Sequence, residues 1–232
     1  MPAWAWPAVT NDDDRLRTRA AGPRFAGLTL ETDAHTACLG AFSGRDGAIL
    51  ITGTGSAGYA LVQGRPHIVG GWGFEVSDEG SGASIGRDAV RAALRGHDGL
   101  VAETALTRHV RAALGPTPAA IVAWADRAKP ADYGKLAPEV LAFAAQGDLV
   151  AIAIIGQAVA NLESYMHRLV ALGAPRLCLM GGLAQPLTPW LSPWAQSLLV
   201  EPEGDALEGS LLLARFGAGT TPSPRDNPNI SR

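Results

Sequence analysis

Short apolar runs along this chain alternate with helical stripes. Residues 47–52 form an apolar, β-branched run, and a similar run at 58–62 follows a turn of glycine, threonine and serine. Two such runs around a short glycine turn predict a β-hairpin. Upstream, small and apolar residues recur at helical spacing from Asp33 to Phe42, which predicts a helix that begins at Asp33.

A longer helical stripe lies in the C-terminal half. Its apolar positions are three or four residues apart and predict a helix over 148–172 that packs on a sheet, with Asp148 as N-cap. A strand is expected over 176–180, and a last helix is expected from Asp205, where Glu208 completes a capping box. The members of the stripe are Ile152, Ile155, Val159, Leu162, Met166 and Leu169.

The remaining segments are patterned less strongly. A helix is expected over 81–95, ended by Gly96, and residues 101–146 read as several short helices separated by prolines. The first thirty residues lack periodicity, except for an apolar run at 28–30 that fits a short strand, and the composition after residue 216 predicts disorder. Strands that alternate with helices predict an α/β fold.

Composition narrows the class of protein. The chain has 232 residues, 47% of them apolar and 18% charged, which suffices to bury a core in one or two domains. A formal net charge of −3 offers no basic surface for nucleic acid. No apolar run approaches the roughly 20 residues of a membrane span, and the N-terminus does not resemble a signal peptide. We therefore expect a cytoplasmic protein without a nucleic-acid or membrane partner.

Cysteine and histidine spacing predicts no metal site. Cys38 and Cys178 lie far apart in sequence and lack CxxC spacing, and the five histidines show no ligand spacing. We therefore expect no metal-ligating residue. The sequence leaves the oligomeric state open, with a homodimer as one candidate.

Two glycine turns follow predicted strands. In Gly53-Thr54-Gly55-Ser56, backbone N–H groups can approach an anion, and the hydroxyls of Thr54 and Ser56 add donors, as a triphosphate cradle requires. A plain hairpin turn explains the same residues. Gly181 and Gly182 also have two interpretations: they allow close backbone approach to an adenosine, or they form an ordinary turn at the end of a strand.

Acidic and aromatic residues accompany these turns. Asp78 and Glu79 precede a predicted helix, where one acid suits the helix N-terminus and two are more than a cap needs. A carboxylate also binds paired sugar hydroxyls, and Trp72 offers a wall for a sugar ring, although a core position explains a tryptophan equally well. Asp33 fits an ordinary N-cap or, at a strand-to-helix junction, the base that takes a proton in phosphoryl transfer.

Four motifs in this order resemble one protein family. They are Thr32-Asp33-Ala34, Gly53-Thr54-Gly55-Ser56, Gly70-Gly71-Trp72-Gly73 and Asp78-Glu79-Gly80-Ser81. From about residue 28 to about residue 216, the chain resembles the N-acetylglucosamine kinases and bacterial glucosamine kinases of the BadF/BadG/BcrA/BcrD ATPase-type group, within the actin-like, sugar kinase and Hsp70 superfamily. The resemblance implies a ribonuclease H-like fold of two domains. It also implies ATP, Mg²⁺ and an amino sugar between these domains, with phosphorylation of the sugar 6-hydroxyl.

The resemblance further implies residue roles. Asp33 corresponds to the catalytic base and Thr54 to a residue that contacts ATP phosphate. Gly55 and Ser56 share the Thr54 loop, which family members also use at the sugar. The sugar-binding positions correspond to Gly71, Trp72, Gly73 and Asp78, and the turn that supports adenosine corresponds to Gly181 and Gly182.

Two departures from the family pattern stand out. Ala57 stands where many members carry asparagine, which removes a polar sugar contact and bears on N-acetyl recognition. The glycine-rich phosphate loop that opens the first domain of the family is absent, so we expect residues 1–42 to be a remnant of that domain plus the connecting helix. We expect residues 43–216 to form most of the second domain, with a helical insert at about 101–146 that carries no chemical motif, and 217–232 to be a disordered tail.

These expectations lead to one function and one alternative. We expect an ATP-dependent amino-sugar kinase, impaired in this fragment because phosphoryl transfer needs charge neutralisation from both sides of the site. The alternative is a non-catalytic protein of the same ATPase family that binds a sugar or a nucleotide. The iron–sulfur activator ATPases of the group are disfavoured, because Cys38 and Cys178 do not suggest a bridging cluster.

Overall fold

The centre of the fold is a four-stranded mixed sheet. The computed structural model describes residues 31–216. Strands β1 (Gly47–Thr52), β2 (Ser56–Val62) and β3 (Arg65–Gly70) form an antiparallel meander, and β4 (Leu177–Met180) pairs in parallel with β1, so the order is β3-β2-β1-β4. The predicted hairpin and the predicted strand at β4 are confirmed. Strand β3 was missed, because this edge strand is largely exposed and lacks a buried apolar run.

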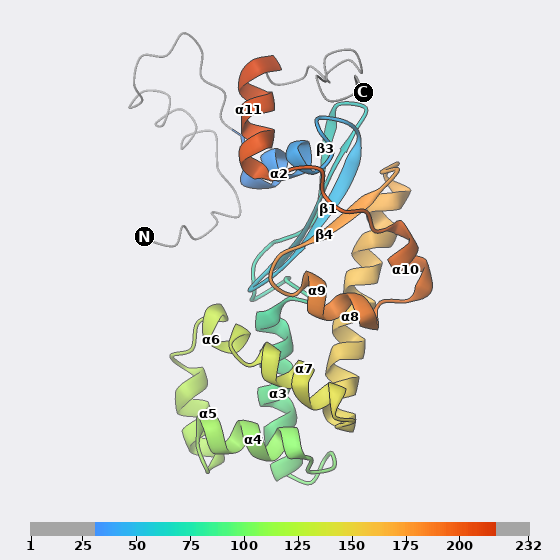
Figure 1. Cartoon of the computed structure of the whole chain (residues 1–232). Helices are drawn as coiled ribbons and strands as arrows, with labels where there is room; N and C mark the ends of the chain where they lie inside the picture. Colours follow the sequence, from blue (N-terminus) through green and yellow to red (C-terminus); the bar gives the residue numbers. More distant parts are fainter. Residues whose placement is uncertain (1–30, 217–232) are drawn as a thin grey trace, which may run out of the picture.

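Helices cover both faces and one end of the sheet (Figure 1). One face carries α2 (Asp33–Ala41) and α11 (Ala206–Phe216), and the other carries α8 (Leu149–Ala171). Beyond one end lies a helical group made of α3 (Gly82–His97), α4 (Ala105–Leu114), α5 (Pro118–Ala125), α6 (Pro130–Gly134) and α7 (Ala137–Ala145). The segments that connect β4 to α11 are α9 (Ala184–Leu187), η1 (Thr188–Trp190) and α10 (Pro193–Leu198).

Strand β1 is buried on both faces and separates two apolar clusters. Ala48 and Leu50 belong to the cluster that includes α8, whereas Ile49 belongs to the cluster that includes α2. Successive side chains of a strand point to opposite faces, so the continuous apolar run in the sequence reflects burial on both sides.

The predicted long helix is confirmed as α8. Asp148 caps it, because its Oδ1 accepts the N–H groups of Val150 at 3.0 Å and Ala151 at 3.1 Å. Its Oδ2 accepts the N–H of Leu106 at 2.9 Å and thereby ties α4 to α8. One stripe member was predicted wrongly: Ile152 is 36% exposed.

Helix α8 also corrects the expectation that no segment reaches the length of a membrane span. By length and composition alone, α8 is apolar enough to cross a membrane. Within this fold it contributes eight buried residues to the core, against the sheet and neighbouring helices. Its place as a core helix accounts for that composition.

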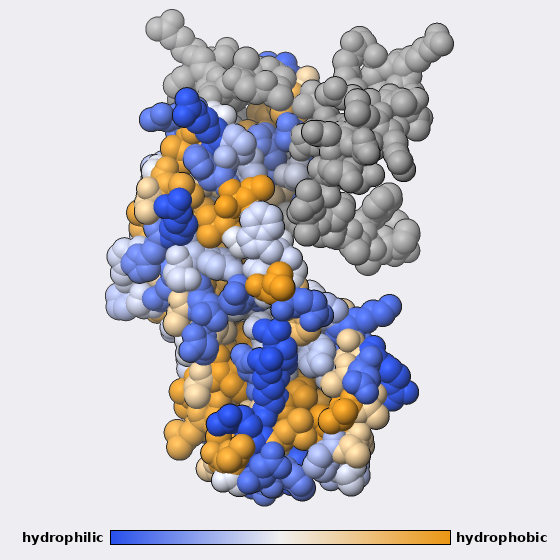
Figure 2. Space-filling view, turned by 180° about the vertical axis from the view of Figure 1, so that it is seen from behind, coloured by the Kyte–Doolittle hydropathy of each residue, from blue (hydrophilic) through white to orange (hydrophobic). Residues whose placement is uncertain are grey.

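The predicted series of short helices between 101 and 146 is confirmed as α4 to α7. Pro118 and Pro130 open α5 and α6, where a missing N–H costs nothing. Helix α3 begins at the N-cap Ser81, as expected, but it continues through Gly96 and ends at His97. Seen from behind, the lower part of the molecule, which contains the helical group and the adjoining end of α8, presents apolar surface on both sides of a hydrophilic band (Figure 2).

Helix α11 crosses α2 at very close range. A Cβ on Gly209 would lie 1.8 Å from the carbonyl oxygen of Thr36, and a Cβ on Gly40 would lie 1.8 Å from that of Asp205. Both helices therefore need glycine at the crossing. The predicted capping box is confirmed, since Asp205 Oδ1 accepts the N–H of Glu208 and Glu208 Oε2 accepts the N–H of Asp205, each at 3.0 Å.

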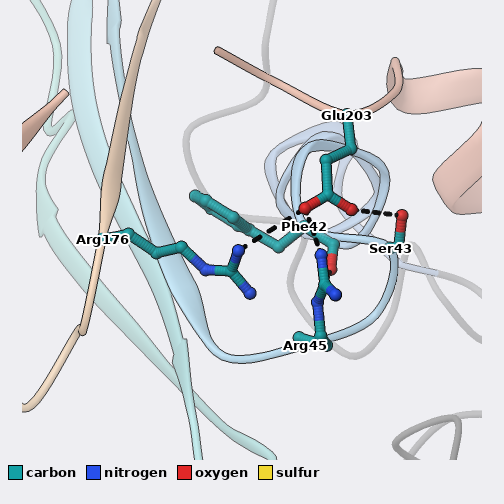
Figure 3. A network of polar contacts seen from close by, with 5 residues as sticks. All are labelled: Phe42, Ser43, Arg45, Arg176 and Glu203. Atoms are coloured by element: carbon teal, nitrogen blue, oxygen red, sulfur yellow. Dashed lines mark hydrogen bonds and ion pairs between the residues drawn. The ribbon is translucent and has the colours of Figure 1, made fainter. Parts of the chain in front are cut away.

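An ionic network holds the segment before α11 to the end of α2 (Figure 3). Glu203 accepts a hydrogen bond from Ser43 at 2.8 Å and pairs with both Arg45 and Arg176. The guanidinium of Arg176 lies 5.3 Å from the centroid of the Phe42 ring. This network lies near the start of β1 and β4, at the end of the sheet away from the glycine turns.

Three expectations remain untested. The predicted strand at 28–30 and the predicted tail after residue 216 lie outside the described residues. The proposed domain boundary at residue 42 also stays a prediction.

Candidate functional site

The predicted site residues other than Asp33 converge at one end of the sheet. Strand β1 ends at Thr52 opposite Ser56, the first residue of β2. Strand β3 ends at Gly70 opposite Ala57, and β4 ends at Met180 opposite Ile51. The three glycine turns, at 53–55, 70–73 and 181–182, therefore lie at the same sheet end, although they are far apart in the sequence.

The first turn is held by the N-terminus of α3. The carbonyl of Gly53 accepts the N–H of Gly82 at 2.7 Å, and the carbonyl of Thr54 accepts the N–H of Ala83 at 3.2 Å. The Gly53 N–H is used within the turn, on the carbonyl of Gly55 at 2.9 Å. The Thr54 side chain remains exposed, so it is available for the predicted phosphate contact.

Two hydroxyls tie this turn to the acidic loop that precedes α3. Ser56 donates to the carbonyl of Glu79 at 2.7 Å, and Thr52 donates to the carbonyl of Gly80 at 3.1 Å. Both residues are buried. A hydroxyl has one proton to donate, and that of Ser56 is used in this structural hydrogen bond. In the predicted contact with a ligand, Ser56 can therefore act only as an acceptor.

Asp78 lies directly against the turn. Its Oδ2 is 2.9 Å from the point where a Cβ on Gly55 would lie, so a side chain at that position would displace the carboxylate. Asp78 adopts a φ of +64°, an uncommon backbone conformation for a residue other than glycine. Burial raises the pKa of Asp78, and backbone hydrogen bonds from Ser56 and Gly73 oppose that rise.

The neighbouring Glu79 is held by a tyrosine that the sequence analysis missed. Tyr165 of α8 donates to Glu79 Oε2 at 2.5 Å, and Ser77 donates to the same oxygen at 3.3 Å. Burial acts to raise the pKa of Glu79, but these two hydrogen bonds and the charge of Arg87 outweigh it, so the pKa is lowered. Burial and the bond to Glu79 raise the pKa of Tyr165 to about 12.

The second turn, residues 70–73, projects from the sheet end and is called the lip below. Gly71 and Gly73 have positive φ values of +75° and +100°, and a Cβ on Gly71 would lie 2.8 Å from the Cβ of Ala57. Trp72 is 60% exposed, so it is not a buried core residue. Its use as a wall for a sugar ring stays a prediction.

An arginine and two aromatic rings fix this lip. Arg87 of α3 donates to the carbonyl of Phe74 at 3.1 Å and lies 4.7 Å from the centroid of the Phe74 ring. The Phe74 ring in turn packs on Tyr133 of α6, with centroids 5.3 Å apart. The sequence predicts no role for Arg87 or Tyr133, because no local motif connects α3 or α6 to the 70–73 turn.

The third turn supports the end of β1. Gly181 has a φ of +99°, and a Cβ on it would lie 2.3 Å from the carbonyl oxygen of Thr52. That carbonyl accepts the N–H of Leu183 at 3.1 Å. Gly182 is exposed, and a Cβ there would meet nothing within 4 Å. Gly181 thus has a structural reason to be glycine, while Gly182 leaves open space beside the site.

Asp33 lies on the other face of the sheet. It is the first residue of α2, and the N-cap is Thr32, whose side chain accepts the N–H of His35. Asp33 is therefore not the cap, which removes one of its two interpretations. Removal of solvent raises its pKa, and a backbone hydrogen bond from Ala34 opposes the rise. Within the described range, no group of three or more histidine, cysteine or acidic residues could hold a metal.

Replacing Tyr165 by phenylalanine tests the acidic loop. A group with a lowered folded-state pKa contributes stability above its unfolded pKa and loses it as the pH falls through the folded value. For Glu79 that loss falls below about pH 4.3. We expect the free energy of unfolding of the variant to be about 1 kcal/mol lower than that of the wild type at pH 7. Between neutral pH and pH 3, that free energy should fall less in the variant than in the wild type. Urea unfolding at both pH values measures this, and an unchanged acid loss would contradict it.

Comparison with known proteins gives a family match. The BadF/BadG/BcrA/BcrD ATPase family matches residues 12–214. Glucosamine kinase GspK of Vibrio cholerae is 43% identical over 190 residues, which cover 82% of this chain and 65% of that kinase. The chain thus spans about two thirds of the length of that relative. An N-acetylmuramic acid/N-acetylglucosamine kinase of Clostridium acetobutylicum is 44% identical over 72 residues, or 31% of this chain and 24% of that protein.

Solved structures show the same fold. A Chromobacterium violaceum protein assigned to the N-acetylglucosamine kinases matches with a TM-score of 0.80 and 39% identity, over 88% of this chain and 72% of that one. A Porphyromonas gingivalis protein with the same assignment matches with a TM-score of 0.60 at 19% identity, over 79% of this chain and 65% of that one, which supports the fold alone. The predicted actin-like ATPase fold is confirmed. With three of the four motifs at one sheet end and a family match over most of its length, the chain belongs to the BadF/BadG/BcrA/BcrD ATPase family.

Proposed function

We propose that this protein transfers a phosphoryl group from ATP to the 6-hydroxyl of an amino sugar. The observation that carries the proposal is Asp78, held against Gly55 in the turn where the exposed Thr54 is available to a phosphate. A half-buried carboxylate beside a partly exposed backbone turn suits a sugar hydroxyl next to a phosphate chain. The names of the relatives support the same substrates.

The proposed roles follow from these positions. Asp78 accepts hydrogen bonds from sugar hydroxyls, Trp72 covers one face of the ring, and the backbone of Gly71 and Gly73 completes the sugar lip. Thr54 contacts the phosphates, and the open space at Gly182 receives the adenosine. These assignments rest on position and family resemblance together.

Asp33 is the proposed base. As the O6–phosphorus bond forms and ADP leaves, the proton of the sugar 6-hydroxyl passes to the Asp33 carboxylate. A raised pKa makes that carboxylate a better proton acceptor. Asp33 lies at the start of α2, which covers the face of the sheet opposite α8, so the proposal requires the 6-hydroxyl of a sugar at the sheet end to reach toward that face.

Magnesium fits this site only as part of the nucleotide complex. Mg²⁺ in kinases is bound by phosphates, waters and one or two carboxylates. Asp78 and Glu79 are the carboxylates of the sheet end, and Glu79 is engaged by Tyr165 and Ser77. We therefore propose that phosphates and water hold the ion, which supplies charge neutralisation on the transferred group.

The test compares substrates under matched conditions. Single-turnover assays with Mg-ATP and glucosamine, N-acetylglucosamine or glucose measure sugar phosphate formation, and calorimetry measures ADP binding. We expect ADP binding and slow transfer that is fastest to glucosamine, because this fragment supplies only one side of the charge neutralisation and Ala57 offers no polar side chain for an acetyl group. Ligand binding without transfer would favour the non-catalytic alternative, and absence of both ADP and sugar binding would overturn the proposal.

A further inference from the structure

The only two lysines of this chain flank one short helix. All other basic side chains among its 19 Lys and Arg residues are arginines. Lys129 immediately precedes α6 and Lys135 immediately follows it. The helical insert showed no chemical motif in the sequence, so this pair became notable only through its position in the fold.

Helix α6 packs against the candidate site. A Cβ on Gly134 would lie 3.8 Å from the Thr54 side chain and 3.9 Å from the backbone of Gly82, so the C-terminal end of α6 borders the phosphate turn and the start of α3. A Cβ on Gly86 would lie 1.9 Å from the carbonyl oxygen of Tyr133, which shows how closely the backbones of α3 and α6 approach. Lys135 directly follows Gly134, the residue of α6 that borders the turn.

Aromatic contacts fix α6 from two further sides. The Tyr133 ring packs on Phe74 of the sugar lip, with centroids 5.3 Å apart, and on Trp124 of α5 at 4.8 Å. Helix α6 therefore joins the lip, the phosphate turn and the rest of the helical group. The backbone that carries Lys135 is therefore already fixed before a ligand binds, so binding has to order only the side chain.

The carboxylate of Asp132 accepts hydrogen bonds from both lysine residues. Asp132 Oδ1 accepts a hydrogen bond from Lys135 Nζ at 2.8 Å, and its Oδ2 accepts the backbone N–H of Lys129 at 3.0 Å. The pKa of Asp132 is lowered by the bond from Lys135, by the Lys129 N–H and by both charges. A single carboxylate cannot balance two ammonium groups. The Lys135 side chain is 75% exposed and can move from Asp132 to a stronger anion.

Acidic and basic residues thus lie on opposite sides of the Gly53–Ser56 turn. On the Gly55 side lie the carboxylates of Asp78 and Glu79, and on the Thr54 side lies α6 with its lysines. Sugar hydroxyls and an amino group suit the acidic side, whereas a phosphate chain suits the basic side.

We propose that Lys135, with Lys129 in support, binds the phosphate chain of the nucleotide from the helical insert. This inference deepens the proposed function and rests on it. It assigns the insert a direct part in recognising a nucleoside polyphosphate, and it sets the direction in which the nucleotide lies across the turn. A free phosphate ester, such as the sugar phosphate product, offers the same chemistry and is separated by the test.

The test measures binding of ADP, adenosine and glucosamine 6-phosphate to the full chain by calorimetry, without metal. For Lys135→Gln we expect the Kd for ADP to rise about three- to tenfold, while adenosine binding is unchanged. Lys129→Gln should produce a smaller rise, and Lys135→Arg should restore most of the affinity. The matched control is Arg108→Gln on α4, which removes one exposed positive charge of the same helical group away from α6.

The outcomes separate the two proposals. ADP bound equally well by wild type and Lys135→Gln would overturn the role of the lysine and leave the kinase proposal standing. An equal loss in Arg108→Gln would overturn it too, because it would show a general effect of net charge. Weaker binding of glucosamine 6-phosphate with unchanged ADP binding would overturn the assignment to the nucleotide. No ADP binding by the wild type would overturn both proposals.

Discussion

Replacing Asp33 by asparagine is expected to lower the single-turnover rate of phosphoryl transfer to glucosamine by about 10²- to 10⁴-fold, the usual contribution of a general base. The amide keeps the shape of the carboxylate but cannot accept the proton of the attacking hydroxyl. ADP and glucosamine affinities should stay within about twofold, since the roles in binding belong to other residues.

A matched control separates this effect from a loss of net charge. Asp98→Asn makes the same chemical change at an exposed residue that caps the C-terminus of α3. It should leave the transfer rate unchanged. If Asp33→Asn transfers phosphate as fast as this control, Asp33 is not the base.

Replacing Gly181 by alanine is expected to destabilise the fold by about 2 to 5 kcal/mol, from a strained backbone and an overpacked contact. The added Cβ would meet the Thr52 carbonyl at 2.3 Å, at a φ of +99° that a residue with a side chain rarely adopts. Urea unfolding monitored by tryptophan fluorescence measures the change.

The neighbouring glycine provides a control within the same turn. Gly182→Ala adds the same methyl group where nothing lies within 4 Å, so its stability should stay within about 0.5 kcal/mol of the wild type. Equal losses in the two variants would show that the contact between Gly181 and Thr52 is not what makes glycine necessary.

Several local patterns predicted their elements well. The hairpin at β1 and β2, the long helix α8 with its cap at Asp148, and the capping box at Asp205 all depend on residues close in sequence. Local rules apply to them directly. Strand β3 failed the same rules, because an exposed edge strand needs no apolar run.

The motifs of the site were visible in the sequence, but their supports were not. Asp78 and the glycine turns carried recognisable patterns. Tyr165 lies 86 residues beyond Glu79 and reaches it only because α8 packs on the sheet. Lys135 lies in a segment without any motif, and only the close backbone approach at Gly86 brings α6 to the turn.

The sequence by itself determined most of the elements, the α/β class and the family resemblance, because periodicity, capping and glycine turns are properties of neighbouring residues. Only the tertiary structure decided which distant segments contact one another. It places α6 beside the Thr54 turn, directs the Ser56 hydroxyl to the carbonyl of Glu79 and leaves Trp72 exposed. These outcomes depend on packing between distant segments. Hydrogen bonds and steric limits set by those contacts leave no local pattern along the chain.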